Sequence, residues 1–174
     1  MGCNVIFHSR RLFSLFIPLF VGVCSSPPTY AGGDATCAQT IELVEDDESA
    51  TLPGQIRQST DDGARIPISG LPPRGLGVRA AAPVHDWFVI IKRSVVQVKQ
   101  RPLLLEAVHG LTTELGRVRL DLRGKSAATA RVRLRRFHKD DRYRSANTHV
   151  HLKDITRTEA ENYLRDIPRG DDLD

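Results

Sequence analysis

Residues 117–134 read RVRLDLRGKSAATARVRL, and apolar and charged side chains alternate along both arms of this stretch. Successive side chains of a β-strand point to opposite faces, so Val118, Leu120 and Leu122 share one face and the arginines share the other. Residues 124–126, Gly-Lys-Ser, have the composition of a turn. The stretch therefore predicts a β-hairpin with an apolar face and an arginine face.

Two segments before this stretch also carry apolar patterns. Residues 87–91 form an unbroken apolar run, which is typical of a central strand covered on both faces. Val96 and Val98 then alternate with polar residues, and the sequence leaves open whether the strand continues or turns back. From Pro102 to Gly116 the period becomes that of an amphipathic helix. Its apolar stripe, at i, i+4, i+7 and i+11, consists of Leu104, Val108, Leu111 and Leu115.

The C-terminal part contains the best-marked helix. Residues 148–153 alternate and predict a further strand. Thr156 with Glu159 forms a capping box that starts a helix, which Pro168 and Gly170 end. The expected buried stripe of this helix consists of Ala160, Tyr163, Leu164 and Ile167. Two helices of this kind can cover the apolar face of one antiparallel sheet, so we expect an α+β fold built as an open-faced sandwich.

The N-terminus has the pattern of a secretory signal peptide. Positively charged residues precede an apolar run, residues 12–24, which is too short to span a bilayer as a helix. Small residues favour cleavage after Ala31, with Ser25 as a second candidate. We therefore expect residues 1–31 to be a leader, a secreted or extracytoplasmic protein, and no stable membrane span.

Charge divides the rest of the chain. Residues 32–84 are acidic and rich in proline and glycine, which predicts a disordered linker or pro-region. Residues 85–169 hold 19 lysines and arginines against 10 aspartates and glutamates, and we expect the folded α+β domain there. Residues 170–174 form an acidic tail that is expected to fray.

The sequence offers little chemistry for catalysis or metal binding. Removal of the leader leaves Cys37 as the one cysteine, either free or paired with another chain. His149 and His151 share a strand face, but a zinc site needs further ligands that the sequence does not indicate. Because no Gly-X-Ser-X-Gly, phosphate-binding loop or His-Glu-X-X-His is present, we expect a protein that is not an enzyme and has no cofactor or metal.

The predicted arginine face is the main candidate for binding. Clustered arginine can hold an anionic polymer or lipid head groups, although the solvent face of any sheet must be polar. Aromatic side chains that would stack on bases are missing from the strands, which argues against single-stranded nucleic acid. The candidate residues are Arg117, Arg119, Arg123, Arg131, Arg133, Arg135, His149, His151 and Lys153.

Two segments resemble known families. Residues 87–92, Trp-Phe-Val-Ile-Ile-Lys, and residues 155–168, which contain Ile-Thr-Arg-Thr-Glu-Ala, resemble the first strand and second helix of subtilisin-type propeptides. The same pattern is also similar to the peptidoglycan-binding sporulation-related repeat. The first resemblance implies a ferredoxin-like sandwich that helps a serine protease to fold and then inhibits it with its C-terminal tail. The tail residues here are Asp171, Asp172, Leu173 and Asp174.

These observations support two expectations about function. The first is a secreted, non-catalytic module that binds a protein partner, as a propeptide-like inhibitor or chaperone of a serine protease. The alternative is a binder of an anionic polymer or a membrane surface through the arginine face.

Overall fold

The computed structural model describes residues 35–45, 50–78, 82–137, 142, 144–147, 152 and 154–173. Residues 33–174 belong to one compact unit, and the leader expected at residues 1–31 lies outside the described residues. The strands are β1 (Thr36–Glu45), β2 (Gly54–Ser59), β3 (Arg65–Ile66), β4 (Phe88–Ile90), β5 (Ser94–Lys99), β6 (Pro102–Val108), β7 (Gly116–Asp121) and β8 (Ala127–Leu134). The helices are the 3-10 helix η1 (Pro83–Asp86) and the α-helix α1 (Arg157–Gly170).

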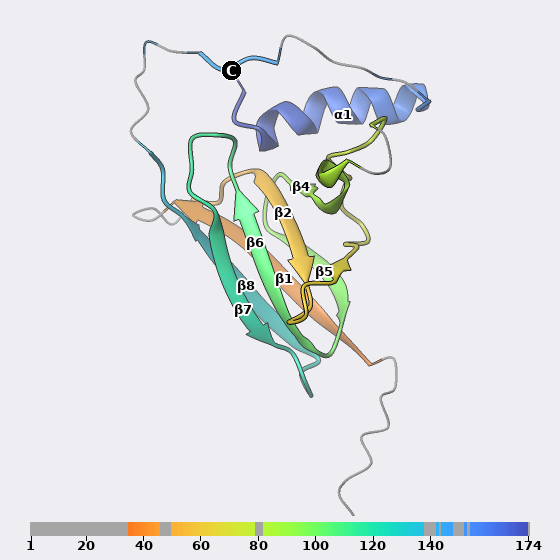
Figure 1. The fold of residues 1–174 in the computed structure, drawn as a ribbon, viewed down its shortest axis with the longest axis vertical. Helices are drawn as coiled ribbons and strands as arrows, with labels where there is room; N and C mark the ends of the chain where they lie inside the picture. The colour runs from red at the N-terminus through yellow and green to blue at the C-terminus, as the bar shows by residue number, and fades with distance from the viewer. Residues whose placement is uncertain are drawn as a thin grey trace, which may run out of the picture. The chain divides into compact units, whose positions relative to one another are not determined.

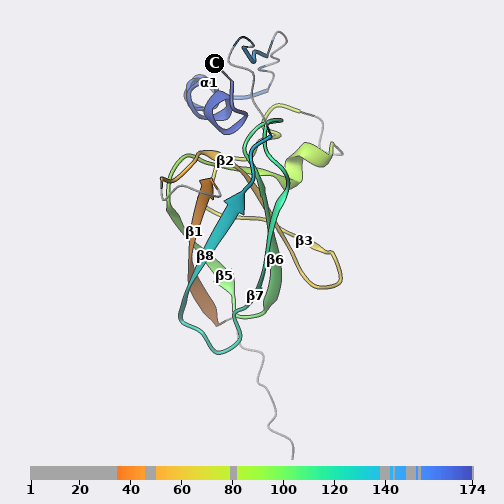
Figure 2. The same ribbon diagram turned by 90° about the vertical axis from the view of Figure 1, so that its left-hand side faces the viewer.

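The strands form two sheets, seen as separate layers in Figures 1 and 2. Sheet A has the order β5-β1-β8, in which β1 is antiparallel to β5 and parallel to β8. Sheet B has the order β3-β2-β6-β7, and β4 also pairs with β2. All pairs in sheet B are antiparallel. The described parts of residues 35–137, which leave out 46–49 and 79–81, therefore form a two-sheet β-sandwich.

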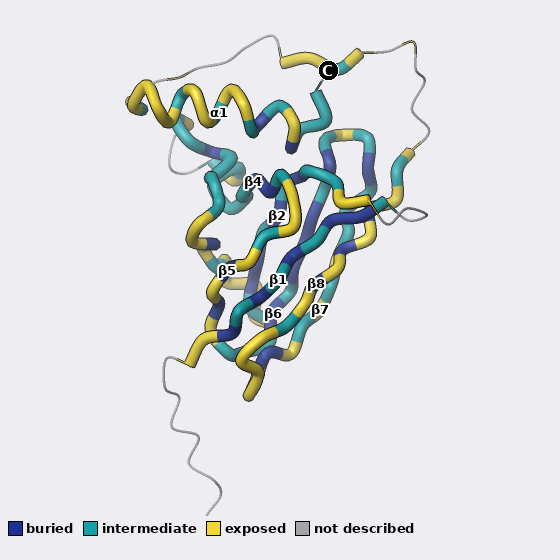
Figure 3. The backbone as a smooth tube through the Cα atoms, turned by 180° about the vertical axis from the view of Figure 1, so that it is seen from behind, coloured by how far each residue is buried: buried dark blue, intermediate teal, exposed yellow. Residues whose placement is uncertain are grey.

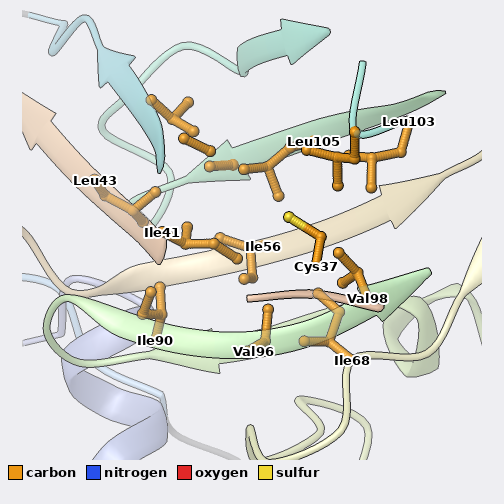
Figure 4. Close-up of a cluster of buried hydrophobic side chains, with 14 of the residues drawn as sticks. Cys37, Ile41, Leu43, Ile56, Ile68, Ile90, Val96, Val98, Leu103 and Leu105 are labelled. Atoms are coloured by element: carbon orange, nitrogen blue, oxygen red, sulfur yellow. The ribbon is translucent and has the colours of Figure 1, made fainter. Parts of the chain in front are cut away.

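The core lies between the two sheets. Figure 4 shows side chains of both sheets pointing into the same space, among them Ile41 of β1, Ile56 of β2 and Leu105 of β6. Burying a side chain of this size stabilises a fold by about 1.5–3 kcal/mol. Gln39 and Gln58 are also buried, and the amide of Gln58 donates a 2.7 Å hydrogen bond to Gln39 across the core.

The expected fold class is wrong. The described residues contain two packed sheets and one α-helix, and not a single ferredoxin-like sheet covered by two helices. The helix expected at residues 102–115 is strand β6 and the turn after it. Because β6 pairs with β2 on one side and β7 on the other, Leu103, Leu105 and Ala107 alternate into the core. The spacing of Leu104, Val108, Leu111 and Leu115 did not decide the structure.

The stretch at residues 117–134 is only partly as expected. Both strands form, and the alternation of inward apolar and outward charged side chains is confirmed in β7 and β8. The hairpin is wrong, because β7 pairs with β6 in sheet B while β8 pairs with β1 in sheet A. Residues 122–126 therefore carry the chain from one sheet to the other, and Leu122 within them is buried.

The disordered linker expected at residues 32–84 needs the same kind of correction. β1, β2 and β3 lie within it, and β1 is the middle strand of sheet A. Cys37, Ile41 and Leu43 of β1 are buried. The polar loops around β1 dominate the average composition of residues 32–84, so the alternation of buried and outward residues in β1 was missed. The folded region accordingly begins near residue 36 and not near residue 85.

The C-terminal helix is confirmed. Thr156 accepts from the backbone of Glu159, and the Glu159 side chain accepts from the backbone of Thr156, which completes the capping box. α1 packs against β4 and β2. Figure 3 shows most of α1 exposed and its C-terminal end buried, where Ile167 and Gly170 lie. Leu164 of the expected stripe is exposed, and the strand expected at residues 148–153 falls largely outside the described residues.

Candidate functional site

The structure separates the residues that were expected to form one basic face. Arg117 and Arg119 lie on the outer face of sheet B, whereas Arg131 and Arg133 lie on the outer face of sheet A. The two sheets turn their inner faces toward a common core, so these pairs point to opposite sides of the sandwich. The sequence located the outward positions correctly and assigned them to the wrong common surface.

The remaining members of that set have other surroundings. Arg123 lies in the crossing between the sheets and binds Asp121 through two guanidinium nitrogens, which lowers the pKa of Asp121 to about 2. Arg135 lies just after β8 and binds Glu114. The other three candidates fall outside the described residues: His149, His151 and Lys153.

A buried carboxylate organises the outer face of sheet B. The strand register places Glu106 of β6 between Arg57 of β2 and Arg117 of β7. Arg57 Nε donates to Glu106 Oε2 at 2.6 Å, and Arg117 Nε donates to Glu106 Oε1 at 3.0 Å. Arg65 Nη1 lies 3.6 Å from Glu106 Oε2. Three guanidinium groups therefore share one carboxylate whose side chain is 6% exposed.

The charge state of Glu106 follows from this geometry. Burial opposes ionisation, but the hydrogen bonds from Arg57 and Arg117 outweigh it, so the pKa of Glu106 lies below its usual value. The guanidinium of Arg57 also stacks over the ring of Trp87, 4.6 Å from its centroid. Arg57 is thus fixed from two directions, by a carboxylate and by an aromatic ring.

A second row of the same face adds two arginines. In the strand register, Arg65 of β3 lies opposite Ser59 of β2, and Ser59 lies opposite Leu104 of β6. Arg119 of β7 lies opposite Leu104, so Arg65 and Arg119 stand at the two ends of one row across the sheet. Arg119 is exposed and lies 3.8 Å from Asp61, and Arg65 lies 3.4 Å from Asp86. Asp61 and Asp86 are themselves partly or largely exposed, so Glu106 is the one enclosed anion among these pairs. We call the set Arg57, Arg65, Arg117 and Arg119 the arginine face.

The sequence missed half of this surface. Arg57, Arg65 and Glu106 became neighbours of Arg117 only through long-range strand pairing. The local sequence around Arg57, Gln-Ile-Arg-Gln-Ser, has no alternation of apolar and charged residues that would have located this arginine.

The acidic tail is attached to the body of the fold. Asp171 accepts from Arg74 Nε at 3.0 Å and from Arg74 Nη2 at 2.6 Å. Asp172 Oδ2 accepts from Thr112 Oγ1 at 2.6 Å and from Arg136 Nη1 at 3.0 Å. The Leu173 N–H donates to the Pro168 carbonyl at 2.9 Å. The tail expected to fray is thus held in place up to Leu173, and Asp174 lies outside the described residues.

A buried histidine completes this arrangement, which we call the C-terminal clamp: Asp171, Asp172, Arg74, His109 and Arg136. His109 Nε2 lies 3.0 Å from Asp172 Oδ1, and Nδ1 is buried with no hydrogen-bond partner among the described residues. Burial lowers the pKa of His109, and the positive charge of Arg136 lowers it further. Asp172 raises the pKa of His109, but the net pKa lies below its usual value. Asp172 has a lowered pKa because Thr112, His109 and Arg136 together outweigh its burial. His109 is therefore neutral near pH 7, with its proton on Nε2.

The described residues offer no obvious centre for other chemistry. They contain no group of three or more histidine, cysteine, aspartate or glutamate side chains that could hold a metal ion. None of the helices described is long and apolar enough to cross a membrane. Cys37 is a buried free thiol, so pairing with another chain would require it to leave the core.

Comparison with known proteins assigns no relative. No protein-family model matches the chain, and searches of curated proteins and of solved structures find no significant match. The residues of the arginine face and of the clamp must therefore carry any functional conclusion on their own.

Proposed function

We propose that this chain is a non-catalytic binding module, acting outside the cytoplasm, that holds an anionic polymer against the arginine face of sheet B. The observation that carries the proposal is the sharing of the Glu106 carboxylate by Arg57, Arg117 and Arg65. Glu106 positions three guanidinium groups, and the four arginines of the face meet three carboxylates, Glu106, Asp61 and Asp86, which leaves one positive charge in excess.

The geometry suits an extended anionic ligand. Arginine presents planar pairs of donors to carboxylate, sulfate or phosphate groups, and a polymer gains further affinity by releasing counterions. Because Glu106 and Trp87 already hold Arg57, and Glu106 holds Arg117, less side-chain entropy is lost when a ligand binds. Arg57 covers the Trp87 ring, which makes base stacking there unfavourable and favours an acidic polysaccharide over single-stranded nucleic acid.

The test is retention on immobilised heparin as a function of salt. The double variant R117A/R119A should elute at clearly lower salt than the wild type, because it removes two guanidiniums from the arginine face. The matched control is R131A/R133A, which removes the same charge from the outer face of sheet A and should cause a smaller shift. Equal shifts in both variants would indicate attraction by net charge alone, and no retention of the wild type would remove the proposal.

The protease-inhibitor alternative depends on the tail. To enter a protease cleft, Asp171 and Asp172 would have to leave Arg74, Arg136 and His109. The ferredoxin-like sheet implied by the propeptide resemblance is also not the fold of the described residues. We therefore propose polymer binding first, and inhibition of a subtilisin-type protease that depends on Leu173 would displace it.

A further inference from the structure

The carboxylates of the arginine face are of two kinds. Glu106 is enclosed, and its two oxygens accept hydrogen bonds from guanidinium groups at 2.6 Å and 3.0 Å. Asp61 is 62% exposed and lies 3.8 Å from Arg119, and Asp86 is 38% exposed and lies 3.4 Å from Arg65. Both distances exceed those of ordinary N–H···O hydrogen bonds. Glu106 is thus a fixed part of the face, whereas Asp61 and Asp86 are held loosely.

Neither aspartate is needed to build its own loop. Asp61 lies in the turn between β2 and β3, where the neighbouring Asp62 accepts hydrogen bonds from the Thr60 hydroxyl and the Ala64 N–H. Asp86 is the last residue of η1, and within the described part of the chain its carboxylate binds only the arginine of β3. The carboxylates of Asp61 and Asp86 can therefore leave their arginines without loss of the local structure.

The two loosely held pairs stand at opposite ends of one row across sheet B. Arg65 belongs to β3 and Arg119 to β7, and strands β2 and β6 lie between them. Three strand spacings separate the two backbones by about 14 Å. Only an extended ligand with several anionic groups can therefore bind both arginines at once.

We propose that Asp61 and Asp86 are exchangeable anions, which bind Arg119 and Arg65 in the free protein and are replaced there by anionic groups of the bound polymer. This inference rests on the proposed function and adds to it the residues that compete with the ligand. A sulfate or carboxylate of the polymer can make the bidentate contact that the aspartates lack at their present distances. After the exchange the four arginines of the face share Glu106 alone, which favours a polyanion over a single small anion.

The test is the affinity of the full chain for a heparin decasaccharide, measured by calorimetric titration at physiological salt. D61N removes the competitor of Arg119 and should raise the affinity by about twofold to fivefold, the range expected for an exposed ion pair. The matched control E161Q removes a carboxylate that is 60% exposed and also binds an arginine, Arg157, on α1. E161Q should change the affinity less than D61N, because salt screens distant charges.

A double-mutant cycle shows whether Asp61 acts through Arg119. In an R119A background D61N should leave the affinity unchanged, because the competitor then has no arginine to release. A gain that persists in this background would indicate a general effect of local charge and would overturn the inference. D86N with R65A gives the same test at the other end of the row.

Ligand length tests the requirement for an extended polymer. The double variant D61N/D86N should gain about the product of the two single effects with the decasaccharide, and no more than the larger single effect with a heparin disaccharide. Equal gains for both lengths would contradict the inference. Binding in which D61N cannot be distinguished from E161Q would remove this inference alone, whereas a wild type that does not bind heparin would remove the proposed function with it.

Discussion

Replacing Asp172 with asparagine tests whether the C-terminal clamp holds the fold together. Asp172 binds three side chains at once: Thr112 and Arg136 through Oδ2, and His109 through Oδ1. The asparagine keeps the shape but loses the charge, and its amide group turns donors toward donors. The variant therefore leaves Arg136 and the buried His109 without their shared partner.

The size of the effect follows from burial. Removing one partner of a buried ion pair costs about 3–5 kcal/mol, and an exposed pair costs about 0–1 kcal/mol. The Asp172 side chain is 16% exposed, and Arg136 keeps a second carboxylate, Glu45, at 3.0 Å. We therefore expect D172N to lower the free energy of unfolding by about 3 kcal/mol, toward the low end of the buried range.

Urea unfolding followed by the fluorescence of Trp87, the single tryptophan, measures this quantity. The matched control is D121N, which also removes a carboxylate bound by an arginine, Arg123, but in an exposed pair. The control should lose far less stability than D172N. A D172N variant within about 0.5 kcal/mol of the wild type would refute the reasoning, because that is the scatter of ordinary surface substitutions.

The pH dependence of stability gives a second check on the same site. The pKa of His109 in the folded state lies below its usual value of 6.5. Neutral His109 is therefore compatible with full stability of the fold above pH 6.5, and stability is lost as the pH falls below 6.5. His109 faces Asp172, Arg136 and Glu45. Because Asp172 raises the pKa of His109, D172N should steepen the loss of stability between about pH 7 and pH 5. H109Q should flatten it, and an unchanged slope in H109Q would contradict the assignment.

Two further substitutions test other parts of the structure. E106Q should lower the free energy of unfolding by about 2 kcal/mol, because Arg57 and Arg117 lose their common carboxylate. The loss is moderate because both arginines remain partly exposed to water. Urea unfolding measures this loss, and a variant as stable as the wild type would argue against Glu106 as the organiser of the arginine face. G110A should lower the thermal midpoint more than G124A: both have positive φ, but only at Gly110 would a Cβ collide with Asp171. Equal midpoints would show that the turn gives way.

The sequence predicted the directions of side chains better than the partners of strands. In β7 and β8 the two-residue period correctly separated Val118 and Val132 from Arg117 and Arg131. Periodicity states which side of a strand is buried, but it says nothing about the neighbouring strand. A turn-like Gly124 between two such strands is equally compatible with a hairpin and with a crossing between sheets, and the structure has the crossing.

The false helix at residues 102–115 has a related cause. Leu103, Leu104 and Leu105 are consecutive, so an apolar run of this kind fits an interior strand as well as part of a helical stripe. The pairing of Glu106 with Arg57 and Arg117, which favours the strand, joins residues 49 and 11 positions apart. In contrast, the helix at Thr156 was predictable because its capping box is a contact between residues three positions apart.

The tail shows how internal pairing limits what remains for binding. Its acidic residues looked available to a partner, yet Asp171 and Asp172 neutralise Arg74 and Arg136 inside the fold. The arginines of sheet B are different, because several of them share Glu106. Variants of Arg117 and Arg119 therefore test binding directly, whereas variants of the tail first change the contacts that hold the fold together.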